Sequence, residues 1–212
     1  MRRIVTGLLA LLCTFPGAAF AAPCGEVVSI ATHDGTTTRY SFGPPQSGAR
    51  ARAALVLLAG GGGVLNLDDG GCARALEGNS LVRSADAFRA LGFATALVDA
   101  PSDHNADEDG LRGFRSDAKH AEDLGRIVAD LRARVGAPVW ILGTSRGSIS
   151  AVNAASRLKG AQAPDGIVLT SALMAGGKGN KSWVRDSVFD HDLGAIKLPA
   201  LVVGHAGDKC TR

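Results

Sequence analysis

The order of apolar and polar positions along the chain predicts strands that alternate with helices. Two short alternating segments, 27–31 and 36–42, flank His33-Asp34-Gly35 and predict an N-terminal hairpin. Residues 53–58 form a continuous apolar run, which is typical of a strand buried on both faces. The same patterns predict further strands at 93–98, 138–142, 166–170 and 200–203, and helices at 84–91 and 147–158.

The longest predicted helix ends at Gly136. Its apolar residues recur at helical spacing while charged residues occupy the other face: Ala121, Leu124, Val128, Leu131 and Val135. Strands that alternate with helices predict an α/β fold, with a doubly wound, mostly parallel sheet and helices on both faces. In such a sheet the functional site lies at the carboxyl ends of the strands.

The first residues have the pattern of a signal peptide. Arg2 and Arg3 supply the charged start, 4–12 the apolar stretch, and Ala19-Phe20-Ala21 a small-x-small cleavage site. We therefore expect residues 1–21 to be removed and 22–212 to form the mature domain. The expected location is periplasmic or secreted, without a membrane anchor after cleavage.

Composition narrows the classes of function. The 212 residues suit one domain, and 46% hydrophobic with 20% charged residues is an ordinary globular balance. The net charge is only +3 and no basic run occurs, so nucleic acid is not an expected partner. Nothing in the sequence indicates the oligomeric state.

The mature chain would keep an odd number of cysteines. Removal of 1–21 takes away Cys13 and leaves Cys24, Cys72 and Cys210 in a compartment where disulfides form. A Cys24–Cys72 pair is slightly preferred, because Cys210 lies two residues from the end of the sequence. The other pairings stay open at this stage.

The strongest chemical signal is Gly143-Thr144-Ser145-Arg146-Gly147, a G-x-S-x-G between an apolar strand and an Ala-rich helix. A serine on so sharp a turn needs small residues on both sides, because strand and helix backbones approach closely there. This context predicts that Ser145 is a nucleophile raised above the sheet. The alternative is an ordinary turn in which Ser145 caps the helix.

Two groups are expected to stabilise an oxyanion. The first is the backbone N–H of Arg146, and the second comes from Gly61 or Gly62 in the glycine run 60–63, which follows an early strand. A phosphate-binding loop fits poorly, since no G-x-G-x-x-G register closes and no lysine follows. We expect no cofactor, and no two histidines have metal-ligand spacing along the sequence.

With these motifs in order, the mature chain resembles the α/β-hydrolase superfamily. The resemblance rests on the glycine-rich loop after a buried strand, on Gly113-Phe114-Arg115 before a helix, and on 139–147 around Ser145. It implies a catalytic acid after the seventh strand and a histidine after the eighth. Carried over, it makes Asp208 the acid, with Asp186 and Asp190 as weaker alternatives.

The histidine that the resemblance implies has no counterpart, because only residues 209–212 follow Asp208. His205 and His191 are the weaker candidates for a base. The remaining histidines are expected in loops or as surface or packing residues: His33, His104 and His120. These observations favour a chain that lacks the last strand and helix of the fold and is C-terminally incomplete.

The sequence thus predicts a serine hydrolase that cleaves a small-molecule ester or related acyl bond through an acyl-serine intermediate, with activity impaired where the histidine is missing. Acyl transfer and peptide hydrolysis use the same serine chemistry and stay open. The alternative is a non-catalytic module that binds a small ligand or partner protein in the same crevice. Residues 103–110 and 174–192 are expected to shape the pocket.

Overall fold

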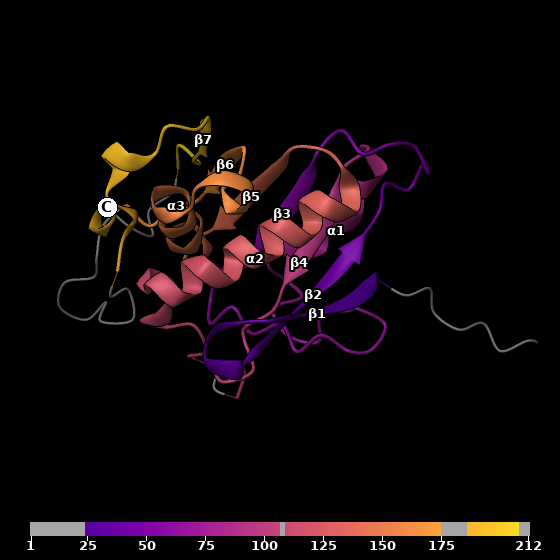
Figure 1. Cartoon of the computed structure of the whole chain (residues 1–212), viewed down its shortest axis with the longest axis horizontal. Coiled ribbons are helices and arrows are strands. Elements are labelled where there is room, and N and C mark those ends of the chain that lie inside the picture. The colour runs from indigo at the N-terminus through magenta and orange to yellow at the C-terminus, as the bar shows by residue number, and fades with distance from the viewer. Residues whose placement is uncertain (1–23, 107–108, 175–185, 208–212) are drawn as a thin grey trace, which may run out of the picture.

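The computed structural model describes residues 24–106, 109–174 and 186–207 (Figure 1). The strands are β1 (Glu26–Ala31), β2 (Thr37–Gly43), β3 (Ala54–Leu58), β4 (Ala94–Val98), β5 (Val139–Thr144), β6 (Gly166–Thr170) and β7 (Ala200–Val203). The α-helices are α1 (Ser80–Ala90), α2 (Ala118–Val135) and α3 (Gly147–Arg157). The short 3-10 helices are η1 (His33–Gly35), η2 (Phe114–Ser116), η3 (Gly160–Gln162), η5 (Val188–Asp190) and η6 (Leu193–Ala195).

All the predicted strands and helices are present, and α1 shows the largest shift in position. It begins at Ser80 rather than at residue 84. Asn79 caps this end, because its side chain accepts a hydrogen bond from the Leu81 backbone N–H at 3.0 Å. Leu81 is also buried against the sheet, so the added turn is fixed by packing as well as by its cap.

The seven strands form one sheet in the order β1-β2-β4-β3-β5-β6-β7. β1 and β2 form the expected antiparallel hairpin, and β2 is also antiparallel to β4. All other neighbours are parallel. Loops that follow the parallel strands therefore collect at one edge of the sheet, where the segment after β5 carries Ser145.

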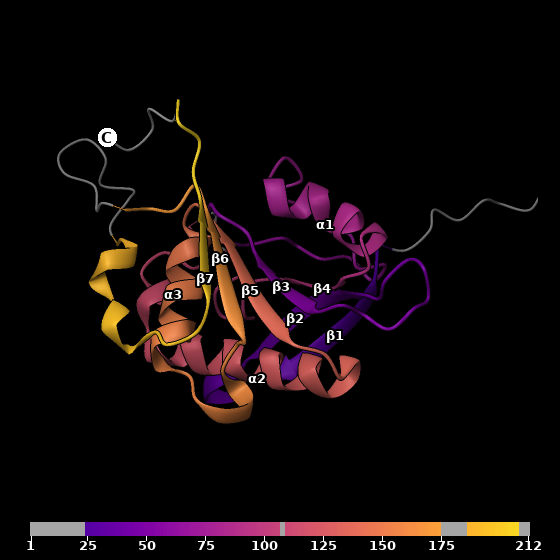
Figure 2. The same cartoon turned by 90° about the horizontal axis from the view of Figure 1, so that it is seen from above.

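Helices cover both faces of this sheet, with α1 on one face and α2 and α3 on the other (Figure 2). The apolar side chains of β3 contribute to the hydrophobic cores on both faces of the sheet. Ala54, Val56 and Leu58 belong to the core on the α2 and α3 face, whereas Leu55 and Leu57 belong to the core on the α1 face. Since successive strand residues face opposite sides, a strand between two helical layers is apolar throughout.

Helix α2 has the predicted apolar stripe. Four of its side chains are almost completely buried: Leu124, Ile127, Val128 and Leu131. Asp117 caps its start by accepting a hydrogen bond from the Lys119 N–H at 2.8 Å. Gly136 ends the helix with φ of 61°, a left-handed conformation that glycine adopts without steric cost.

Strand β7 is the edge of the described sheet, and all of its residues are exposed. Its exposed apolar side chains are Leu201, Val202 and Val203. Residues 208–212 lie outside the described part, and that the chain lacks the last strand and helix of the fold stays a prediction. The signal-peptide segment 1–21 is also outside it. No helix in the described ranges has the length and apolar character needed to cross a membrane.

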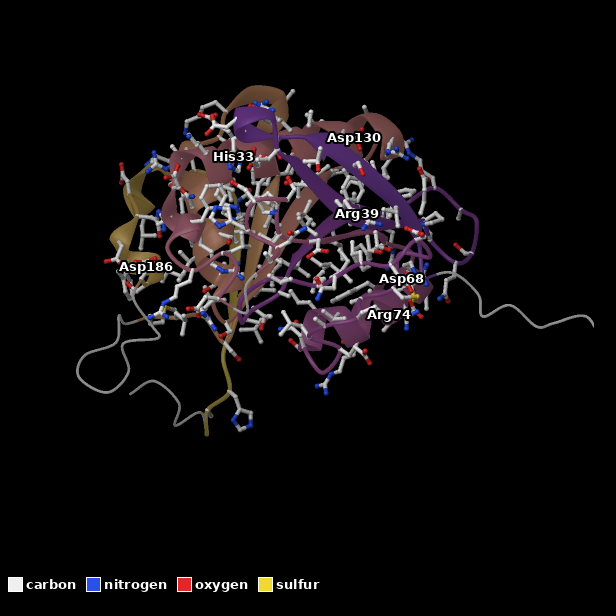
Figure 3. All side chains as sticks on the ribbon, turned by 90° about the horizontal axis from the view of Figure 1, so that it is seen from below. His33, Arg39, Asp68, Arg74, Asp130 and Asp186 are labelled. Atoms are coloured by element: carbon white, nitrogen blue, oxygen red, sulfur yellow. A yellow bond between two sulfur atoms is a disulfide. The ribbon has the colours of Figure 1, made fainter. Side chains whose placement is uncertain are left out.

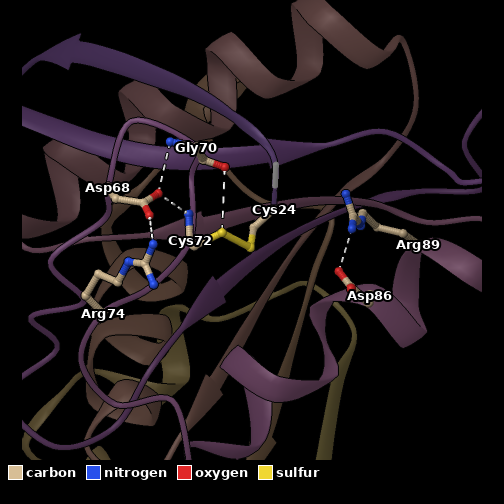
Figure 4. The surroundings of a disulfide bond; sticks show 7 residues. All are labelled: Cys24, Asp68, Gly70, Cys72, Arg74, Asp86 and Arg89. Atoms are coloured by element: carbon tan, nitrogen blue, oxygen red, sulfur yellow. Dashed lines mark hydrogen bonds and ion pairs between the residues drawn. A yellow bond between two sulfur atoms is a disulfide. The ribbon is translucent and has the colours of Figure 1, made fainter. Parts of the chain in front are cut away.

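A disulfide joins Cys24 to Cys72, with the Cα atoms 4.9 Å apart, and confirms the preferred pairing. It ties the start of β1 to the loop between β3 and α1 (Figure 4). Asp68 shapes this loop by accepting hydrogen bonds from the Gly70 and Cys72 N–H groups, each at 2.9 Å, and by pairing with Arg74. Cys210 lies outside the described residues.

We expect the paired substitution of Cys24→Ser and Cys72→Ser to lower the free energy of unfolding by about 2 to 4 kcal/mol, because the bond constrains the unfolded chain. Urea unfolding of the oxidised protein and of the double variant measures the difference. Addition of a reductant should shift only the wild-type midpoint. Equal midpoints in oxidising buffer would contradict the stabilising role.

Candidate active site

Ser145 stands on a sharp turn between β5 and α3. Its backbone has φ of 52°, a left-handed conformation that is rare for a residue with a side chain. The Ser145 N–H donates to the Thr170 carbonyl at 3.0 Å, so the turn is held to the end of β6. This is the strained strand-to-helix turn that G-x-S-x-G motifs form.

The two glycines of the motif are required by backbone contacts. An added Cβ on Gly143 would lie 2.3 Å from the Gly147 carbonyl oxygen, and one on Gly147 would lie 2.1 Å from the Leu58 carbonyl oxygen. Both obstacles are main-chain atoms, which cannot rotate away as a side chain does. The first turn of α3 therefore rests directly on the end of β3.

The glycine loop after β3 lies against the Ser145 side chain. An added Cβ on Gly60 would be 2.9 Å from Ser145 Cβ and 3.5 Å from Ser145 Oγ. Gly61 and Gly63 have φ of 60° and 78°, which glycine tolerates best. The glycines thus allow the loop backbone to come close to the serine.

Every carbonyl group of this loop from Ala59 to Gly62 accepts a hydrogen bond. The Gly63 N–H donates to Gly60 O at 3.2 Å and the Leu111 N–H to Gly62 O at 2.9 Å. Arg115 Nη2 donates to Ala59 O at 3.1 Å and to Gly61 O at 3.3 Å. These bonds fix the orientation of the peptide groups in the loop.

The N–H groups expected to bind an oxyanion are unoccupied. In the ranges that the structure describes, no residue accepts a hydrogen bond from the N–H of Gly61, Gly62 or Arg146. Arg146 directly precedes α3, so its N–H lies at the positive end of that helix. That these N–H groups bind an oxyanion stays a prediction; the structure places the neighbouring Gly60 against Ser145.

Arg115 is the buried support of the glycine loop. Its side chain is almost completely buried, and besides the two loop carbonyls it donates to Ser150 Oγ at 2.9 Å. Burial, with a smaller effect of the Arg146 charge, lowers its pKa to about 9. Because the guanidinium is still protonated at neutral pH, it holds carbonyl oxygens that a neutral side chain would bind more weakly.

His120 completes this network from the neighbouring helix. It is buried, and its Nε2 lies 2.8 Å from Ser150 Oγ. Burial first, and then the charge of Arg115, lower its pKa to about 3. Since Arg115 only donates, Ser150 accepts from Arg115 and has its own proton to donate to the neutral imidazole. His120 is therefore a buried packing residue rather than a surface one.

None of the five histidines, all of which the structure describes, makes a hydrogen bond with Ser145 Oγ. His191 Nε2 lies 3.4 Å from Ser116 Oγ, and burial, followed by the Arg157 charge, lowers its pKa. His205 is exposed and accepts a hydrogen bond from the Gly207 N–H at 3.1 Å. The conformation shown thus pairs no base with the serine.

The expected acid, Asp208, lies outside the described residues. Of its alternatives, Asp190 accepts a hydrogen bond from the Ser187 N–H at 2.6 Å and caps its own short helix. Asp186 lies at the margin of the molecule, well apart from His33 (Figure 3). Neither carboxylate hydrogen-bonds to a histidine among the described residues.

A pocket of about 390 Å³ opens beside the glycine loop and is lined by Gly62, Val64, Asn66, Ala75, Leu76, Asn105 and Ala106. Asn105 and Ala106 belong to the segment 103–110 that was expected to shape the site. The other expected segment, 174–192, is described only at Met174 and from Asp186 onward. The pocket places mainly apolar side chains next to Gly62.

The supporting network was missed by sequence reasoning. In the sequence, Gly113-Phe114-Arg115 indicates only the family resemblance and no role for the Arg115 side chain. One signal was an arginine shortly before the long helix, but no pattern along the sequence indicates that its side chain is buried. Its position depends on the packing of the loop against α3, where Asn153 Nδ2 donates to the Arg115 carbonyl at 2.9 Å.

The buried neutral His120 predicts acid-sensitive stability. The unfolded chain binds a proton on this residue near its ordinary pKa of 6.5, whereas the folded chain does so only near 3. Between these values His120 favours unfolding by about 1.4 kcal/mol per pH unit as the pH falls. Urea unfolding at pH 6.5, 5.5 and 4.5 should therefore show a steeper loss for the wild type than for His120→Gln. Parallel losses in the two proteins would refute this.

Comparison with known proteins gives likeness in structure only. No protein-family model and no curated protein matches the sequence. A lidless α/β serine hydrolase from Xanthomonas campestris is 15% identical, with 86% of this chain and 84% of that chain covered and a TM-score of 0.52. A monoglyceride lipase from Saccharomyces cerevisiae, in a soluble variant, is 19% identical over 74% of this chain, with a TM-score of 0.52.

Dipeptidyl peptidase 4 from Porphyromonas gingivalis is 11% identical over 84% of this chain, with a TM-score of 0.54. The chain spans 47% of the length of the lipase and 27% of that of the peptidase. At such identities a structural match establishes architecture and not activity. With the strand order, the parallel pairing and the serine turn described above, it shows that this chain has the α/β-hydrolase fold.

Proposed function

We propose that the protein is a serine hydrolase that cleaves an ester bond through an acyl-serine intermediate on Ser145. The observation that carries the proposal is the strained Ser145 turn against the glycine loop, where the N–H groups of Gly61, Gly62 and Arg146 donate to no acceptor among the described residues. In this reaction Ser145 Oγ loses its proton and bonds to the substrate carbonyl carbon, and the carbonyl oxygen gains the negative charge. Collapse breaks the bond from the carbonyl carbon to the ester oxygen, which takes up a proton and leaves as the alcohol. Water then adds to the acyl-serine and releases the acid and the free Ser145 hydroxyl.

The oxyanion would be held by the Arg146 N–H and by one of the two glycine N–H groups. Both donors come from backbone that neighbouring groups already fix, so little reorganisation accompanies the development of charge. The pocket beside Gly62 is mainly apolar and would accept an uncharged part of the substrate.

The expected rate depends on whether a base acts on Ser145. Oxyanion stabilisation and binding alone give about 10³ to 10⁴-fold acceleration over water in serine proteases without a complete triad. An ester with a good leaving group is favoured over a peptide, because its alkoxide or phenolate departs without the proton that an amine needs. Asp208 is proposed as the acid partner of a base.

A second candidate is a non-catalytic module that binds a small ligand in the same crevice. The observation that favours it is that none of the five histidines is paired with Ser145. The same pocket and donors would then bind a carbonyl or carboxylate group without chemistry.

We also propose that the protein works outside the cytoplasm. The Cys24–Cys72 disulfide supports an oxidising compartment, and the pattern of residues 1–21 supports export.

A fluorophosphonate probe should label the wild type and fail to label Ser145→Ala, because only a nucleophilic hydroxyl forms the phosphonyl ester. Ser47→Ala, which removes an exposed serine far along the chain from the motif, should be labelled like the wild type. Gel fluorescence and peptide mass spectrometry give the extent and the position of labelling. Equal labelling of wild type and Ser145→Ala would exclude Ser145 as the nucleophile.

Absence of labelling in the wild type, together with saturable binding of a small carboxylate or ester, would favour the non-catalytic candidate.

Arg115→Lys should reduce kcat for p-nitrophenyl butyrate by about tenfold to a hundredfold while KM changes little. The reason is that a lysine has one nitrogen, which cannot replace both Nη2 on the loop carbonyl groups and Nη1 on Ser150 Oγ, and misplacement of the oxyanion donors affects the transition state above all. Arg83→Lys, an exposed position on α1, is the matched control. A fall in activity that only follows the loss of folded protein in thermal melts would argue against a positioning role.

A further inference from the structure

Apart from the residues of the Ser145 turn and the glycine loop, three side chains bring metal-ligating atoms together. His33 lies at the turn of the β1–β2 hairpin (Figure 3), while Asp103 and His104 lie in the loop after β4. His33 Nε2 is 3.1 Å from Asp103 Oδ2, and His104 Nε2 is 3.8 Å from the same oxygen. All three ligating atoms lie within 4.8 Å of one another.

These separations are close to those of a tetrahedral metal site. Zinc bonds to nitrogen and oxygen of about 2.0 to 2.1 Å place neighbouring ligand atoms about 3.3 Å apart. Asp103 Oδ2 already lies near that distance from one imidazole and within about half an ångström of it from the other. A rotation of His104 toward the other two ligands would complete the three-ligand set.

A second carboxylate orients the buried imidazole. His33 Nδ1 lies 2.6 Å from Asp123 Oδ2, and the His33 backbone N–H donates to Asp123 Oδ1 at 2.8 Å. With Nδ1 donating to Asp123, Nε2 points toward Asp103 and is the ring atom available to a metal. An imidazole held by a carboxylate in this way is the usual support of a zinc-bound histidine.

The ring of Phe114 forms one wall of the cluster. It stacks on His104 with ring centroids 4.3 Å apart and lies 4.9 Å from the centroid of His33. The other side is open, since the side chains of Asp103 and His104 are 42% and 29% exposed. An ion can therefore enter from solvent and keep a water as its fourth ligand.

We propose that His33 Nε2, Asp103 Oδ2 and His104 Nε2 bind a divalent transition-metal ion, with Zn²⁺ as the ion of choice. Two imidazoles and one carboxylate suit zinc and its neighbours better than Mg²⁺ or Ca²⁺, which prefer sets of oxygen ligands. The ion takes the place of the proton that His33 Nε2 otherwise shares with Asp103. It joins the hairpin turn to the loop after β4, and through Asp123 to α2.

This site does not depend on the proposed hydrolase activity, so its test uses binding and stability. The untagged full chain is treated with a chelator and dialysed, and ZnCl₂ is then titrated into it in a calorimeter. We expect saturation at one ion per chain and a rise in the melting temperature. His104→Gln and Asp103→Asn should each weaken Zn²⁺ binding by about tenfold or more.

His205→Gln is the matched control, because it removes an exposed histidine outside the cluster and should bind Zn²⁺ like the wild type. Metal-free melting curves of all variants establish that each is folded. The proposal is overturned if the wild type shows no saturable binding, or if both ligand variants bind Zn²⁺ as tightly as the wild type.

Discussion

The contact on which the site depends is the approach of the first residue of α3 to the end of β3. The Leu58 carbonyl oxygen lies where a Cβ of Gly147 would be, and the Gly147 carbonyl lies where a Cβ of Gly143 would be. Only glycine fits at these positions. Because the two backbones meet there, the turn that carries Ser145 and the glycine loop after β3 are brought together.

A buried cation then holds that loop in place. Arg115 makes no ion pair with a carboxylate among the described residues, and burial of an unpaired charge is costly. Its compensation comes from the Ala59 and Gly61 carbonyl groups and from Ser150, so the charge stays solvated only while the loop keeps its shape. Ser150 also makes a hydrogen bond with His120, which is neutral in the folded state. The shape of the glycine loop and the stabilisation of the buried Arg115 charge therefore depend on each other.

Local patterns in the sequence were enough to predict the strands. A continuous apolar run such as that of β3 is typical of a strand that is buried on both faces. They also predicted the Ser145 turn, since the flanking glycines are a local requirement. The start of α1 was misplaced because the packing of Leu81 against the sheet is a tertiary contact. The burial of Arg115, His33 and His120 could not be predicted either, because their partners lie 30 to 90 residues away in sequence.

We propose that Ser145 forms an acyl-enzyme beside N–H groups whose positions the fold already fixes. The most direct test is rapid mixing of the protein with an excess of p-nitrophenyl acetate, followed by mass analysis of the quenched chain. We expect a burst of about one p-nitrophenol per chain and an acetyl group on Ser145, followed by slow turnover. A linear release without a burst, identical in wild type and Ser145→Ala, would contradict it.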